Sequence, residues 1–178
     1  MLIQEKLSAE LRADILAYLA AHYDELVLQR CGQDTLSLDD GEYQKNAMPM
    51  MVSKTMSLKE MLKELDAGFS ETLMQLIDQS GKKDAEIYKR AGLTKQHFSK
   101  IRSNANYRPT KPTALALAIA LELNLEQTMD LLSRAGYTLS NSSKFDLIVR
   151  YFIEQGRYDL MEINLALYEF DQPLLGSC

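Results

Sequence analysis

The chain has 178 residues, of which 46% are hydrophobic and 25% charged, the composition of a globular protein with a core of its own. Its net charge of −5 argues by itself against nucleic-acid binding, and its two cysteines, Cys31 and Cys178, argue against a disulfide framework or a structural zinc site. The longest apolar run, residues 114–121, is too short to cross a membrane and no secretory signal opens the chain, so we expect a cytoplasmic protein.

Apolar residues recur at helical spacing from the start of the chain. The first apolar face comprises Leu7, Leu11, Ile15, Leu19, His22 and Leu26. Ser8 is placed to cap this helix and Gly32 to end it. Residues 32–55 are irregular, and Asp40-Gly41 suits the turn of a short hairpin. We therefore assign residues 1–55 to an N-terminal helix and an irregular segment.

Two helices are predicted before Gly81. The sequence Ser57-Leu-Lys-Glu60 is a capping box and should open the first. The second should run over residues 70–79 and end at Gly81, with Leu73, Leu76 and Ile77 facing inward.

A helix-turn-helix is predicted between residues 84 and 103. Asp84 can cap a short helix that ends at Ala91, and Gly92 follows where a left-handed residue is needed to turn the chain. Leu93 can fill the corner between the helices, and Thr94 can cap the second one. We place this unit in a domain of residues 56–140.

The remaining helices carry equally local signals. Pro112 suits the first turn of a helix that runs to about residue 123, and Asn124, with Gln127 three residues later, caps the next. Ser143 and Asp159 should open two more helices, which form a C-terminal pair in residues 141–178. The expected fold is all-α, with N-terminal and C-terminal helices added to the helix-turn-helix core.

Positive charge is concentrated in one part of this acidic chain. Residues 81–112 hold nine basic against two acidic residues, a local charge of +7 that leaves −12 for the remainder. The basic residues are Lys82, Lys83, Lys89, Arg90, Lys95, Lys100, Arg102, Arg108 and Lys111. Such a segment is typical of a nucleic-acid surface, although a solvated basic helix face would have the same composition.

The second helix of the unit is predicted to enter the major groove of DNA. Phe98 and Ile101, three residues apart, should face inward. The candidate DNA-binding residues on and before this helix are Thr94, Lys95, Gln96, His97, Ser99, Lys100 and Arg102. Lys can contact guanine and Gln can contact adenine. Candidate phosphate contacts in the flanking segments are Lys82, Lys83, Arg108 and Lys111.

Residues 69–139 resemble the phage-repressor or Cro-like helix-turn-helix family, often called XRE-type. The matching residues are Ile87, Gly92, Leu93, Thr94, Phe98 and Ile101, and the run Ala-Leu-Ala-Ile-Ala-Leu-Glu-Leu-Asn-Leu at residues 116–125 resembles the family's fourth helix. The resemblance implies five helices, of which the second and third read DNA, and the function of a transcriptional regulator. Where this family has a small residue and often a Gln, the chain has Tyr88 and Asp84.

Two further functions stay open. A carboxylate at Asp84 would repel a phosphate, so an adaptor or regulatory subunit that binds a protein partner through the acidic flanks is the main alternative, and RNA binding is another. A homodimer is expected because one reading helix contacts few bases. With no catalytic motif and two widely separated histidines, we expect no enzymatic activity, no metal and no cofactor.

Overall fold

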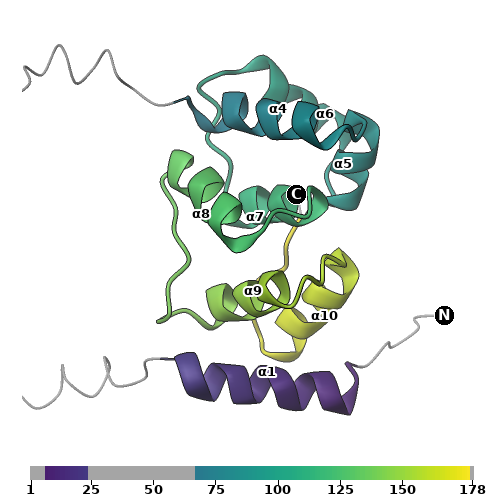
Figure 1. The fold of residues 1–178 in the computed structure, drawn as a ribbon. Coiled ribbons are helices and arrows are strands. Elements are labelled where there is room, and N and C mark those ends of the chain that lie inside the picture. Colours follow the sequence, from purple (N-terminus) through teal and green to yellow (C-terminus); the bar gives the residue numbers. More distant parts are fainter. Residues whose placement is uncertain (1–6, 24–66, 177–178) are drawn as a thin grey trace, which may run out of the picture. The chain divides into compact units, whose positions relative to one another are not determined.

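A computed structural model describes residues 7–23 and 67–176 of the chain, which group into one compact unit (Figure 1). The described residues form eight helices and no strand, so the predicted all-α fold is confirmed for this part. The hairpin expected at Asp40-Gly41 and the helix start at Ser57 lie outside the described residues. The first helix, expected to run to Gly32, ends at His22, because Tyr23 has an extended backbone that closes the helix.

The helix boundaries follow the capping residues closely. The helices are α1 (Ala9–His22), α4 (Phe69–Ser80), α5 (Asp84–Arg90), α6 (Lys95–Ser103), α7 (Lys111–Ala120), α8 (Leu125–Arg134), α9 (Lys144–Glu154) and α10 (Leu160–Glu169). Ser8, Asn124, Ser143 and Asp159 each accept a hydrogen bond from a backbone N–H in the first turn of the helix that they precede, as predicted.

One predicted cap is wrong. Lys83 occupies the N-cap position of α5, without a side-chain hydrogen bond, and Asp84 is the first residue of the helix. The Asp84 carboxylate instead forms an ion pair with Arg102 at the end of α6. The carboxylate of Asp84 therefore binds the guanidinium of Arg102 on α6 and not the backbone N–H groups of α5.

Helix α7 occupies the centre of the core. Every residue from Thr113 to Ala120 is buried, and α7 packs against α5, α8 and α10. A helix that is buried on all sides is apolar all round, so the longest apolar run of the sequence is accounted for by the protein core. None of the described helices is both long and apolar enough to span a bilayer.

The N-terminal helix α1 packs on α9. Leu11, Ile15 and Leu19 are buried there, whereas His22, predicted to continue this face, is exposed and hydrogen-bonds through Nδ1 to the carbonyl of its own helix at Tyr18. The hydroxyl of Tyr18 donates to Glu154 of α9 at 2.7 Å. Burial, together with this carboxylate, raises the pKa of Tyr18 to about 12, so the hydroxyl stays protonated and keeps donating.

The C-terminal pair is held to the rest of the unit by its apolar stripe. The stripe consists of six side chains that are all buried within the chain: Phe145, Ile148, Val149, Phe152, Ile163 and Leu167. They line α9 and α10, which contact each other and also α1, α7 and α8. These six side chains are therefore core residues of the described unit and leave no apolar face of their own for a partner.

Candidate nucleic-acid interface

The turn between α5 and α6 has the predicted geometry. Gly92 has a φ of 65°, the left-handed conformation that reverses the chain after α5. The N–H of Leu93 donates to the carbonyl of Tyr88 at 2.8 Å and its side chain is buried. The hydroxyl of Thr94 accepts from the N–H of His97 at 3.1 Å, which starts α6 at the next residue.

The inner side of α6 fixes its orientation. Phe98 and Ile101 are buried as predicted, and α6 packs against α4, where Leu73 and Ile77 are buried. The half-buried Tyr88 of α5 lies with its ring centroid 5.9 Å from that of Phe98. Tyr88, which stands where the resembled family has a small residue, thus fits between the two helices as an aromatic contact.

The outer side of α6 is polar and exposed. Lys95, Gln96, Ser99 and Lys100 all face solvent. Neither Lys95 nor Lys100 forms an ion pair with any residue that the structure describes, so both ammonium groups are available to an external anion. The helix therefore presents two cations, an amide and a hydroxyl on one face.

A polar hollow of about 460 Å³ lies beside this face. It is lined by Thr94, Gln96, His97, Lys100, Tyr107, Thr110 and Thr113. The predicted contact His97 is part of its wall, where Nε2 lies 2.6 Å from the hydroxyl of Tyr107 in the loop that follows α6. His97 is therefore held in the wall of the hollow and is less exposed than its neighbours on α6.

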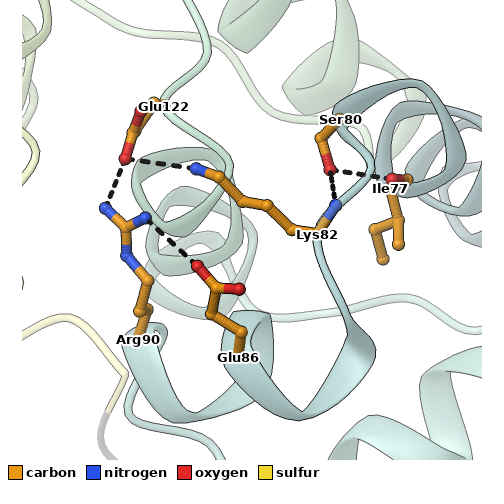
Figure 2. A network of polar contacts seen from close by, with 6 residues as sticks. All are labelled: Ile77, Ser80, Lys82, Glu86, Arg90 and Glu122. Carbon is orange, nitrogen blue, oxygen red and sulfur yellow. Dashed lines mark hydrogen bonds and ion pairs between the residues drawn. The ribbon is translucent and has the colours of Figure 1, made fainter.

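Figure 2 shows that the candidate phosphate contact Lys82 belongs to an internal charge network. Its Nζ is shielded from solvent and lies 3.1 Å from Oε1 of Glu122, which also accepts from Arg90 at 2.6 Å. Glu86 lies 4.0 Å from Arg90 and completes the network. The hydrogen bond from Arg90, and then the neighbouring Lys82 ammonium, lower the pKa of Glu122, which keeps this carboxylate charged.

Two more of the candidate cations have carboxylate partners in the chain. Lys111 Nζ lies 2.6 Å from Oδ2 of Asp146, a residue of α9 that is only 2% exposed. Arg102 pairs with Asp84, as described above. By contrast, Lys83 and Arg108 are exposed and form no ion pair with a described residue. The four candidate phosphate contacts thus divide into an engaged pair, Lys82 and Lys111, and an accessible pair, Lys83 and Arg108.

The segment after α10 packs against the turn between α5 and α6. No feature of the sequence indicates this contact. Asn164 accepts from the N–H of Leu175 at 2.7 Å and donates to its carbonyl at 3.1 Å, so the buried Leu175 is fixed against α10. Gly176 then lies directly on the backbone of Ala91, and Leu160 lies beside Gly92. The turn is therefore packed from outside by α10 and by the residues that follow it.

Comparisons with protein-family models, with curated proteins and with solved structures give no match for this chain. Within residues 7–23 and 67–176, no three His, Cys, Asp or Glu side chains gather in a way that could hold a metal ion. The functional argument therefore depends on the geometry and charge of α6 and its surroundings.

Proposed function

We propose that this protein binds double-stranded DNA sequence-specifically through α6 and acts as a cytoplasmic transcriptional regulator. The observation that carries the proposal is the exposed face of Lys95, Gln96, Ser99 and Lys100 on a helix fixed by a glycine turn. An α-helix with its side chains is about 10–12 Å in diameter, and the major groove is about 12 Å wide, so α6 can enter it.

The ion pairs change which basic residues are expected to contact phosphates. Lys83 and Arg108, which are exposed, are the candidates for phosphate contacts, whereas Lys82 and Lys111 stabilise the fold. Lys100 borders the polar hollow and Lys95 is at the start of α6, so these two lysines and Gln96 are the candidates for base contacts.

Fluorescence anisotropy with a mixed-sequence duplex, measured over a range of salt concentrations, tests DNA binding. We expect Arg108→Ala to weaken binding to all sequences and to reduce the slope of log K against log salt by about one. Lys144→Ala is the control, because it removes an exposed lysine of α9 for which no DNA contact is predicted and whose ammonium lies over the Tyr23 ring. Equal effects of the two substitutions, or no binding at low salt, would count against the proposal.

An adaptor that binds a protein through the same fold is the second candidate. The pairing of Arg102 with Asp84, and of Lys82 and Lys111 with Glu122 and Asp146, favours it because three candidate cations are neutralised within the chain. This candidate predicts no salt-dependent binding to duplex DNA. Preference for single-stranded RNA over duplex in the same assay would favour RNA binding instead.

A further inference from the structure

The loop between α6 and α7, residues 104–110, begins with a hydrogen-bonded turn. Asn104 ends α6, and its carbonyl accepts from the N–H of Tyr107 at 3.0 Å, while its side-chain oxygen accepts from the N–H of Asn106 at 3.0 Å. The hydroxyl of Ser70 on α4, which is 3% exposed, donates to the same carbonyl at 3.0 Å. The first half of the loop is therefore fixed both by its own hydrogen bonds and by α4.

Tyr107 connects this loop to the candidate reading helix. Its hydroxyl lies 2.6 Å from Nε2 of His97 on α6, and the two rings meet edge to face with their centroids 6.0 Å apart. Both side chains are half-buried, and the ring of Tyr107 also packs against the hydrophobic core. Because His97 lies in the first turn of α6, this hydrogen bond links the loop back to the beginning of that helix.

Arg108 lies between two anchored parts of the loop. Tyr107 precedes it, and the buried Pro109 follows it, with its φ restrained by the proline ring. The hydroxyl of Thr110 then accepts from the N–H of Thr113 and starts α7. The side chain of Arg108 is exposed and forms no ion pair with a described residue. The backbone of Arg108 is therefore fixed relative to α6, while its guanidinium stays accessible.

We propose that Tyr107 is a positioning residue for DNA binding, which holds Arg108 in place relative to α6 through its hydrogen bond to His97. The phosphate contact and the base contacts are then presented to the duplex as one rigid unit. An arginine of equal charge on a loose loop would lose more conformational entropy on binding a phosphate and would bind it more weakly. This inference rests on the proposed function, because it gives Arg108 and α6 the roles assigned there.

Tyr107→Phe tests the inference, because it keeps the packed ring and removes only the hydroxyl. It should weaken duplex binding about fivefold, the effect of one hydrogen bond. In an Arg108→Ala background the same substitution should change the affinity by less than about 1.5-fold, since the residue that Tyr107 positions is gone. Fluorescence anisotropy at one low salt concentration measures all four chains of this cycle, and circular dichroism melting shows that each is folded.

Tyr158→Phe is the matched control, because Tyr158 is also half-buried in a loop, between α9 and α10, and its hydroxyl forms no hydrogen bond with a described residue. This control should leave duplex binding unchanged. Ser70→Ala removes the other anchor of the loop and should, like Tyr107→Phe, weaken binding only when Arg108 is present.

Amide hydrogen exchange without DNA gives a second readout. The N–H groups of Asn106 and Tyr107 should exchange faster in Tyr107→Phe than in the wild type or in Tyr158→Phe. Unchanged exchange, or losses of duplex affinity that simply add in the Arg108→Ala background, would overturn the role of Tyr107 and leave the proposed function standing. A wild type that binds no duplex at low salt would overturn both.

Discussion

Gly176 lies so close to Ala91 that a β-carbon on Gly176 would overlap the carbonyl oxygen of Ala91. Ala91 immediately precedes the glycine that turns the chain into α6. The contact therefore connects the segment after α10 to the element that orients the candidate reading helix. Asn164 maintains this contact by holding Leu175 with two hydrogen bonds.

Substitution of Gly176 by Ala should destabilise the protein by about 1–3 kcal/mol, because the added methyl group meets backbone rather than a movable side chain. Gly156→Ala is the matched control. Gly156 has a similar φ of 65°, against 71° for Gly176, but its β-carbon would meet nothing within 4 Å. Urea denaturation measures both variants. Equal losses of stability would mean that Gly176 does not pack on Ala91.

Replacement of Gly92 by Val should cost on the order of 1–3 kcal/mol, since a branched residue would be forced into a left-handed conformation. The β-carbon would also lie 3.2 Å from Cδ2 of Leu160, which adds a steric contact. Thermal melting measures the loss. A melting temperature equal to that of the wild type would contradict the turn described here.

The network around Glu122 predicts a specific pH dependence. The pKa of Glu122 is lowered in the folded chain, so its contribution to stability is complete above the ordinary glutamate pKa of about 4.3 and is lost as the pH falls through the lower, folded-state pKa. Glu122→Gln should therefore destabilise by about 1 kcal/mol at pH 7, a modest figure because the Glu122 side chain is 44% exposed.

Urea denaturation of this variant and the wild type at several pH values checks the sign. The two stabilities should converge as the pH falls from 5 to 3. A difference that grows in acid, or that is absent at pH 7, would mean that Arg90 and Lys82 do not stabilise the charged form of Glu122.

Substitutions in the two pairs of candidate phosphate contacts should have different effects on stability and on duplex binding. Lys111→Ala leaves the buried Asp146 without its counter-ion and should cost about 3 kcal/mol of stability. Lys83→Ala and Arg108→Ala remove exposed side chains and should change stability by less than about 0.5 kcal/mol. Denaturation curves and duplex-binding curves on the same samples separate the two effects. Loss of stability in Lys83→Ala would contradict the assignment.

Local signals made most of the helical boundaries predictable. Ser8, Asn124, Ser143 and Asp159 cap helices because each needs only the N–H groups two or three residues later. Gly92 is equally local, since a left-handed turn depends on a single residue. These features lie within a few residues of sequence, and a single sequence contains all the information that they require.

The charge partners could not be predicted in the same way. Arg90 and Glu122 are 32 residues apart, and Lys111 and Asp146 are 35 apart, so no spacing rule connects them. The net charge predicted for residues 81–112 assumes that Lys82 and Lys111 are accessible to a ligand. In the folded chain each of these lysines instead has a carboxylate beside it. Asp84 fits a cap by position, but the longer-range attraction of Arg102 determined its actual contact.

Selection of sequences from a pool of random duplexes tests the central claim, that α6 reads DNA, most directly. The wild type should enrich one motif at low and at physiological salt. Gln96→Ala should keep binding but relax the preference at one base position, at a cost of about 1–3 kcal/mol there, whereas Arg108→Ala should weaken binding to all sequences alike. No enriched motif at either salt concentration, together with binding that neither substitution changes, would contradict the claim and leave the protein-binding adaptor as the better account.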